Sequence, residues 1–183
     1  IVLTSNYKGY LVPSRGRECS SQQMPFIKDK FPTFSEFAEA TLEDIYGKEA
    51  LDKALHLKVH MLNSVYLEND GNGNFEIKSL PKMLQLAPIM DFEFANIDNN
   101  KGKEIIAIGN HYNAEVETVR YDASLGSILS YKDKKFKVLN MNKTGFINQG
   151  NSKDIIKINK KNETILLITN NDGKVNLFSK QNK

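Results

Sequence analysis

The chain has 183 residues, of which 40% are hydrophobic and 26% charged, and its formal net charge is +3. This composition is that of one folded domain or a piece of a larger one, and no apolar run approaches the roughly 18 residues of a membrane span, which excludes membrane-spanning, collagenous and disordered chains. The positive charge is spread along the sequence and gives no indication of nucleic acid or anionic lipid.

Three six-residue apolar runs that end in asparagine lie at 1–6, 105–110 and 165–170. Each is rich in β-branched or aliphatic residues and is followed by turn residues, a pattern typical of a strand that is buried on both faces. The second and third runs begin 60 residues apart, whereas the first and second begin 104 apart. We therefore expect a repeat whose first copy contains an insertion.

A predicted β-hairpin at 66–78 locates the insertion. Its centre contains Asp-Gly and Asn-Gly steps, and after them Phe75 and Ile77 alternate with charged residues, as in a half-buried strand. The counterpart in the second copy is 128–138, with Phe136 and Val138 in the alternating positions. The insertion thus falls between the apolar run and the hairpin of the first copy.

Helical signals occur within the insertion, which we assign to 28–60. Thr33 and Thr41 each precede a carboxylate by three residues, at Glu36 and Asp44, and this spacing is that of a helix capping box. Apolar residues recur at helical spacing between the two boxes. We predict two or three short helices over 32–57, which cover an edge or a face of the surrounding sheets.

The strands group into copies of about 60 residues. We predict a first copy at 1–6 and 62–80, a complete four-stranded copy at 91–141, and an incomplete copy at 152–180. Four-stranded antiparallel units at this period are typical of the blades of a β-propeller, so the predicted fold is mainly β, with about two and a half blades and a small helical insert. Because the sequence begins at Ile1 without a signal-peptide pattern, we expect a processed piece whose sheet is completed elsewhere in a longer protein or by neighbouring molecules.

Several motifs between roughly residues 9 and 130 resemble those of a known family. They lie at 15–26, 31–33, 42–47, 69–75, 87–88, 109–110, Glu115, 120–123 and Gly126. In these segments the chain is similar to the C-terminal region of the FG-GAP/VCBS-repeat proteins of Bacteroidetes, which are often associated with an ASPIC/UnbV domain. The resemblance implies a seven-bladed type of β-propeller on a secreted or surface-attached protein that binds rather than catalyses.

The same resemblance implies a calcium loop. The matching positions are Asn96, Asp98, Asn100 and Glu104, but Asn stands at two positions where the family has Asp, and Lys101 replaces a glycine. Calcium prefers six to eight oxygen ligands with several carboxylates, so these departures weaken the site and favour an ordinary polar β-turn. Calcium is therefore the weaker alternative here, and no other cofactor is expected.

Catalytic and metal signatures are sparse. The sequence has no nucleophile elbow, P-loop or dinucleotide fingerprint, so no catalytic residue is assigned and we do not expect an enzyme. His56 and His60 have the spacing of two zinc ligands on a helix, but no glutamate follows His56 as a metalloprotease requires. We interpret them as histidines at a helix end, and the single cysteine, Cys19, as a small apolar residue.

The connection at 110–126 is the leading candidate for a recognition site. It contains Asn110, Glu115, Arg120 and Asp122, and the guanidinium of Arg120 is suited to an ion pair with one of the carboxylates. Loops at one rim of a scaffold commonly form binding surfaces. A carboxylate pair that hydrolyses glycosides is the alternative.

We therefore predict a non-catalytic β-propeller module that binds protein or glycan outside the cytoplasm, in an extracellular, periplasmic or outer-membrane surface location. Two alternatives remain, a propeller associated with a carbohydrate-active enzyme and a structural spacer. Nucleic acid is not expected as a partner, because the basic residues near the N-terminus lack interleaved aromatic residues. Open blade edges make self-association a further expectation.

Overall fold

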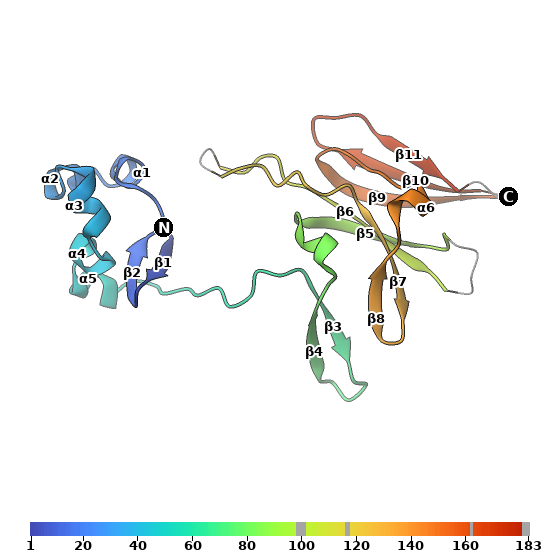
Figure 1. Ribbon diagram of the computed structural model, residues 1–183, viewed down its shortest axis with the longest axis horizontal. Coiled ribbons are helices and arrows are strands. Elements are labelled where there is room, and N and C mark those ends of the chain that lie inside the picture. The colour runs from blue at the N-terminus through green and yellow to red at the C-terminus, as the bar shows by residue number, and fades with distance from the viewer. Residues whose placement is uncertain (98–101, 116–117, 162, 181–183) are drawn as a thin grey trace. The chain divides into compact units, whose positions relative to one another are not determined.

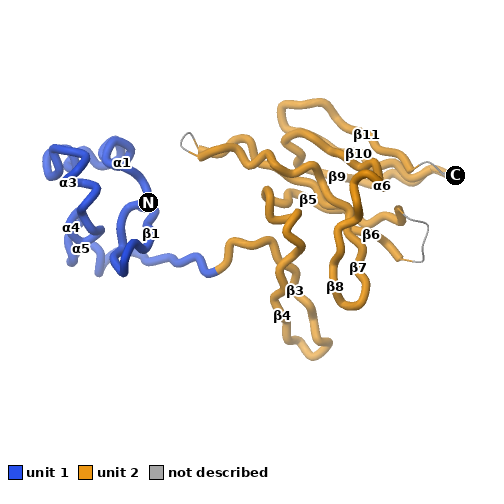
Figure 2. Tube along the Cα trace, viewed as in Figure 1, with its two compact units in different colours: residues 1–60 blue, residues 61–183 orange. Residues whose placement is uncertain are grey.

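The structure is a computed structural model that describes residues 1–97, 102–115, 118–161 and 163–180. It divides into two compact units, Ile1–His60 and Met61–Lys183 (Figure 2). All sheets are antiparallel, strands dominate the second unit, and no sheet formed by the described residues closes on itself (Figure 1). The prediction of a mainly β, antiparallel fold is confirmed.

The first unit consists of one β-hairpin and five short helices. Lys8 and Gly9 both have positive φ (50° and 91°), as a two-residue hairpin turn requires. The elements are β1 (Thr4–Tyr7), β2 (Tyr10–Pro13), α1 (Arg17–Gln23), α2 (Phe26–Lys30), α3 (Phe34–Glu39), α4 (Leu42–Tyr46) and α5 (Lys48–Asp52).

Both predicted capping boxes are present. The Thr33 hydroxyl oxygen accepts a hydrogen bond from the Glu36 backbone N–H (3.2 Å), and the Glu36 carboxylate accepts one from the Thr33 N–H (2.9 Å). Thr41 and Asp44 repeat this arrangement at the start of α4. The helices pack around a small core of Ile27, Phe37, Ala40 and Ile45.

The helical segment begins earlier than predicted, at Arg17 rather than near residue 28. Helix α1 starts after Gly16 and α2 after Pro25, and neither of these residues forms a side-chain cap. Because the side-chain capping signal is absent there, the sequence pattern indicates only α3 and the helices that follow it.

The prediction that 1–6 form a strand buried on both faces is wrong. Strand β1 covers only Thr4–Tyr7, pairs only with β2 and is exposed along its whole length. Its apolar pattern matches that of 105–110, but within its own unit only a second exposed strand lies beside it. The structure also assigns 1–6 and 62–80 to two different sheets, so the expected first blade is not one sheet.

The described residues of the second unit form three sheets in sequence order. The four-stranded sheet β5-β6-β7-β8 confirms the four strands predicted at 91–141, and the three-stranded sheet β11-β10-β9 lies in the incomplete copy predicted at 152–180. The elements are β3 (Val65–Asn69), β4 (Phe75–Ser79), the 3₁₀-helix η1 (Lys82–Gln85), β5 (Ile89–Ala95), β6 (Glu104–Gly109), β7 (Ser127–Lys132), β8 (Lys135–Val138), α6 (Met141–Thr144), β9 (Ser152–Lys160), β10 (Glu163–Asn170) and β11 (Asn176–Ser179).

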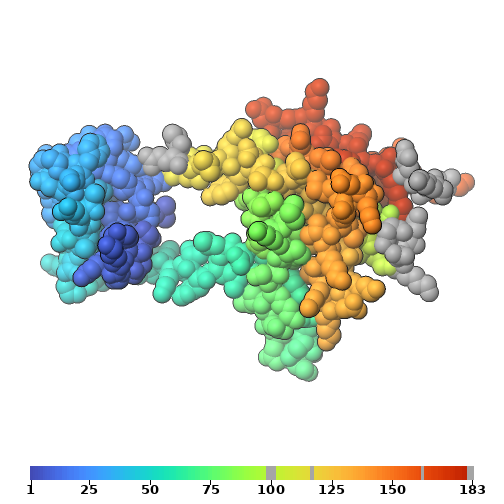
Figure 3. All heavy atoms as spheres, in the orientation of Figure 1, coloured from blue at the N-terminus to red at the C-terminus, as the bar shows by residue number. Residues whose placement is uncertain are grey.

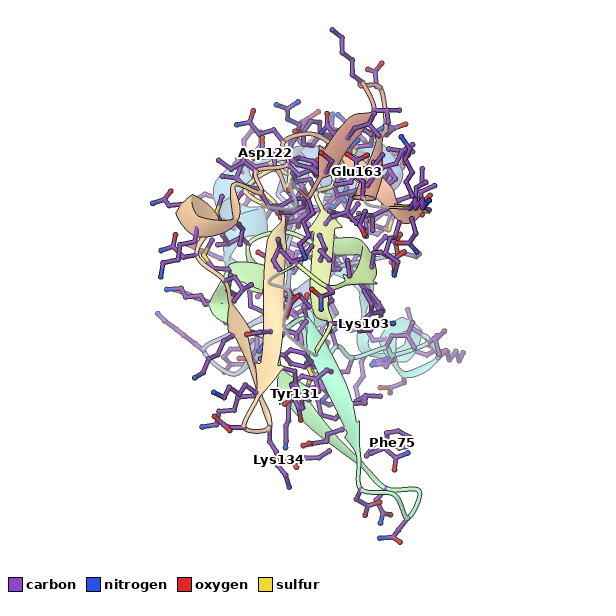
Figure 4. The ribbon with its side chains drawn as sticks, turned by 90° about the vertical axis from the view of Figure 1, so that its right-hand side faces the viewer. Phe75, Lys103, Asp122, Tyr131, Lys134 and Glu163 are labelled. Carbon is purple, nitrogen blue, oxygen red and sulfur yellow. The ribbon has the colours of Figure 1, made fainter. Side chains whose placement is uncertain are left out.

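The β5–β8 sheet is apolar on both faces. One face packs against β9–β11 through a buried cluster of Ala95, Ile106, Ile108, Ile128, Phe146, Ile155, Leu166 and Ile168. The other face meets β3–β4, near Tyr131 in Figure 4. The rings of Tyr66 and Phe136 lie 4.7 Å apart there, and the Tyr131 hydroxyl donates to Glu68 (3.1 Å). Each fully buried Ile or Leu contributes about 1.5–3 kcal/mol, so these faces hold the three sheets in a stack.

The stack repeats one arrangement. The order β3, β4, η1, β5 recurs as β7, β8, α6, β9, with a short helix between the last strand of one sheet and the first strand of the next. The first strands β5 and β9 lie side by side. The carboxylates of Asp91 and Glu93 on β5 accept hydrogen bonds from the backbone N–H groups of Ile155 (2.9 Å) and Lys157 (3.2 Å) on β9. These carboxylates bind backbone N–H groups at the edge of β9 that has no ladder partner among the described strands.

The asparagine at the end of each apolar run holds the turn or connection that follows it. The side-chain oxygens of Asn6 and Asn110 accept from the backbone N–H groups of Gly9 and Ser124, both at 3.0 Å. Asn170 donates to the Lys174 carbonyl at 2.7 Å. This shared role accounts for the asparagine that ends all three runs.

We predict that Gly109→Ala destabilises the protein by about 1–3 kcal/mol, because a Cβ at this position would lie 1.9 Å from the Pro88 carbonyl oxygen. The matched control is Gly102→Ala, whose added Cβ has nothing within 4 Å and which should change stability by less than about 0.5 kcal/mol. Urea unfolding measures both variants. Equal midpoints would contradict the close approach of β6 to the segment before β5.

We predict a pH-dependent gain in stability for Asp154→Asn. Hydrogen bonding with Asp91 and burial raise the pKa of Asp154, so the folded protein holds this proton more tightly than the unfolded chain, and stability is lost as the pH rises through the folded-state pKa. The variant should therefore melt at a higher temperature than the wild type at pH 7, and the difference should vanish near pH 3. A variant that is less stable at pH 7 would argue against the Asp91–Asp154 pair.

Candidate functional site

A cleft of about 370 Å³ opens at one end of the two stacked sheets. It lies between the connection at 110–126 and the turn at 171–175, which follow the equivalent strands β6 and β10 (Figure 3). The lining residues are Tyr112, Asn113, Arg120, Gln149, Gly150, Asn151, Asn170, Asn171, Asp172, Gly173, Lys174 and Asn176. Its volume falls in the range of small-ligand sites.

Arg120 is held at the wall of the cleft by two contacts. Its guanidinium carbon lies 4.6 Å from the centre of the Tyr112 ring, and its Nη2 lies 3.6 Å from Asp122 Oδ2. Two backbone hydrogen bonds between His111 and Tyr121 (2.8 and 3.0 Å) close the base of this connection into a narrow ribbon. The predicted ion pair of Arg120 with a neighbouring carboxylate is present, and Asp122 is the partner.

Side-chain amides form most of the remaining wall. Asn170 is fixed by the Ser152 hydroxyl, which donates to its Oδ1 (2.8 Å), and Asn176 is fixed by donating to Asn148 (2.8 Å). Three other amide side chains in the wall, those of Asn113, Gln149 and Asn171, are exposed and form no hydrogen bond within the described part of the chain. An amide both donates and accepts hydrogen bonds, so these three groups are available to a ligand.

Asn110 does not face the cleft, contrary to its prediction as a binding residue. Its side chain is 1% exposed and donates to the carbonyls of Ser124 and Gly150, both at 2.9 Å. Its backbone oxygen accepts from the Lys153 ammonium (3.1 Å). Asn110 therefore ties the connection at 110–126 to the segment at 149–151, which also lines the cleft, and its positive φ of 105° is a backbone conformation in which asparagine is enriched.

Glu115 also lies outside the cleft lining. Its carboxylate accepts a hydrogen bond from the Thr118 hydroxyl (3.1 Å), which ties the connection to itself. Of the four predicted binding residues, Arg120 lines the cleft and Asp122 pairs with it. The amide-rich turns at 149–151 and 170–176 were missed, although their asparagine content is visible in the sequence.

The degenerate calcium loop is described only in part. Asp98 and Asn100 lie outside the described residues, whereas Asn96 accepts from the Lys180 ammonium at its backbone oxygen (3.1 Å) and at Oδ1 (3.4 Å). Glu104 is 4% exposed and its carboxylate accepts from the Ile97 N–H (2.7 Å). A lysine ammonium at Asn96 repels a second cation. The described residues contain no group of three His, Cys, Asp or Glu that could hold a metal ion.

The two histidines do not lie on one helix. Helix α5 ends at Asp52, before both His56 and His60, so the helical spacing required for a zinc site is not formed. His56 Nε2 instead lies 2.7 Å from the Leu51 carbonyl oxygen. His56 and His60 therefore do not lie on one face of a helix in the described part of the chain.

Comparison of the chain with protein-family models, curated proteins and solved structures gives no match. Among the helices of the described residues, none has both the length and the apolar character that a membrane crossing requires. The assignment of function therefore rests on the geometry of the cleft and of the stacked sheets.

We predict that Asn110→Ala lowers the free energy of unfolding by about 2 kcal/mol or more, because it removes a buried side chain and leaves partly buried backbone groups of Ser124 and Gly150 without their partners. Asn113→Ala, which removes an exposed amide from the same connection, should change it by less than about 0.5 kcal/mol. Chemical denaturation measures both. If Asn110→Ala lowers the free energy of unfolding no more than Asn113→Ala does, the Asn110 amide does not hold the segments of Ser124 and Gly150 together.

Proposed function

We propose that this chain is part of a β-propeller that binds a ligand, without catalysis, in the cleft between the β6–β7 connection and the β10–β11 turn. Three features support the propeller. Antiparallel sheets stack in sequence order, the first strands β5 and β9 lie side by side, and a short helix links each sheet to the next. Blades of a propeller have this relation to one another.

The composition of the cleft is the observation that carries the binding role. Exposed amides at Asn113, Gln149 and Asn171 offer donors and acceptors, and Tyr112 and Arg120 supply an aromatic ring and a planar cation beside them. Sites of this kind fix a ligand by a few placed polar groups. Protein and glycan are both candidates.

Glycan is the better match to the charges of the wall. The positive charges of Arg120 and Lys174 are offset by Asp122, which pairs with Arg120, and by Asp172 in the lining. A wall with little net charge and several amides suits an uncharged, hydroxyl-rich ligand, because hydroxyl groups exchange hydrogen bonds with amides in both directions.

A binding role is favoured over glycoside hydrolysis because Asp172 is the single carboxylate among the described residues that line the cleft. Hydrolysis of a glycosidic bond commonly uses a pair of carboxylates that flank the bond. The location outside the cytoplasm, at the cell surface or in the periplasm, is part of the same proposal and is supported by the family resemblance.

A glycan array probed with the full chain, followed by calorimetry on the best hit, tests the proposal. We expect Arg120→Ala and Gln149→Ala to weaken binding by about tenfold or more, the loss of roughly one good hydrogen bond. The exposed residues Lys137 and Asn142 lie outside the cleft lining, so Lys137→Ala and Asn142→Ala serve as matched controls and should bind normally.

The other hypotheses give different results. Release of shorter sugars from a bound glycan, lost on Asp172→Asn, would indicate an enzyme. A chain that captures no glycan and no protein would indicate a structural spacer. Binding that survives both Arg120→Ala and Gln149→Ala would place the site elsewhere.

A further inference from the structure

The face of the β5–β8 sheet that meets β3–β4 is covered over β6, β7 and β8 but open over the middle of β5. Over β6, Ala107 is 5% exposed and lies in one buried cluster with Leu84 of η1 and Leu129 of β7. Over β7 and β8 it is covered by Tyr66 and Glu68 of β3. Over β5, the side chains of Phe92 and Phe94 are 53% and 44% exposed, and their rings pack edge to face at 5.7 Å. Two neighbouring phenylalanines thus stand uncovered beside an established sheet interface.

The next interface in the stack shows how this part is covered elsewhere. The corresponding strands of the last sheet carry Ile155, Leu166 and Ile168, which are 3%, 4% and 0% exposed. The side chains that cover them come from β5 and β6, among them Ile106 and Ile108. In this interface, therefore, the first two strands of one sheet cover the first two strands of the next.

Strand β3 has an open edge at the equivalent place. It pairs with β4, as β7 pairs with β8, but β7 also pairs with β6, whereas β3 has no second partner among the described strands. The Leu80 N–H donates to the Ser64 carbonyl and the Asp70 N–H to the Asn74 carbonyl. Since bonded positions alternate along an antiparallel pair, the three residues Val65, Leu67 and Asn69 turn their N–H and C=O groups toward the open edge.

We propose that the β3 edge and the rings of Phe92 and Phe94 form one acceptor site for a two-stranded antiparallel β-ribbon from a partner. One strand of the ribbon adds to β3 through the backbone groups of Val65, Leu67 and Asn69. Its apolar side chains, β-branched as in β5–β6, cover the two rings. Two strands are needed because β3 covers β7, whereas the two rings lie on β5, two strands beyond β7 in the sheet.

A second copy of this chain does not fit the site through its own β3. If β3 of one copy paired antiparallel with β3 of a second copy, both β3–β4 hairpins would turn the same face toward the same side of the combined sheet. In each copy the β5–β8 sheet packs on that face of the hairpin. The β5–β8 sheet of the second copy would therefore clash with β5–β6 of the first copy. A separate ribbon has no such sheet beneath it.

The test uses the full chain, isotopically labelled, and a synthetic peptide of residues 89–109 as the ribbon, because β5–β6 performs this role in the next interface. We expect the peptide to slow hydrogen exchange of the Val65, Leu67 and Asn69 amides at least about tenfold. Leu67→Pro removes one edge donor without breaking a bond to β4, and it should abolish the protection. The double variant Phe92→Ser, Phe94→Ser should weaken peptide binding at least about tenfold.

Ile156→Ser is the matched control, since Ile156 is an exposed apolar residue (45%) on β9, and it should bind the peptide normally. No protection at these amides with excess peptide, or protection that survives both the Leu67→Pro and the Phe92, Phe94 changes, would overturn the proposal. A dimer in light scattering with the same three amides protected would identify a second copy as the occupant and would equally overturn it. If Leu67→Pro fails to fold, the loss or retention of peptide binding in the Phe92→Ser, Phe94→Ser double variant decides whether the proposal stands.

Discussion

The contact between the β5–β8 and β9–β11 sheets positions the rest of the second unit. Its apolar part consists of isoleucine and leucine side chains from β6, β7, β9 and β10, and its polar part consists of the Asp91 and Glu93 carboxylates that accept β9 backbone N–H groups. The first part supplies most of the free energy, because buried apolar area is the dominant stabilising term. The second part fixes the register, because each carboxylate is matched to one N–H group.

The cleft follows from this contact. Ile106 and Ile108 of β6 share one buried cluster with Leu166 and Ile168 of β10, and the connections that follow these two strands line one cleft at the same end of the sheets. Asn110 ties the first of these connections to the segment before β9 through Ser124 and Gly150. The same contact leaves the opposite face of β5 dependent on another element, which is why Phe92 and Phe94 are exposed. One packing arrangement thus accounts both for a polar cleft and for an apolar acceptor site.

Elements with a local signal could be predicted from the sequence. The two later sheets begin and end within a few residues of the predicted copies at 91–141 and 152–180, because alternation and β-branched runs are local patterns. The capping boxes at Thr33 and Thr41 were visible for the same reason. Helices α1 and α2 lack that signal, since Gly16 and Pro25 offer no capping side chain.

Features that depend on distant neighbours could not be predicted. The run at 1–6 has the same apolar pattern as 105–110, but burial of both faces requires elements packed above and below the strand, and β1 is exposed along its whole length. Asn110 was assigned to the ligand because it begins a long connection, whereas its burial depends on Ser124 and on Gly150, which lies 40 residues away. The amides of the cleft come from segments that meet only once the repeat is folded.

Methyl-labelled nuclear Overhauser spectroscopy on the full chain tests the central contact most directly. The account predicts cross-peaks between the methyl groups of Ile106 or Ile108 on β6 and those of Leu166 or Ile168 on β10, which share one buried cluster. Cross-peaks within each sheet but none between the two sheets would contradict the stacked arrangement, and with it both the cleft and the ribbon site.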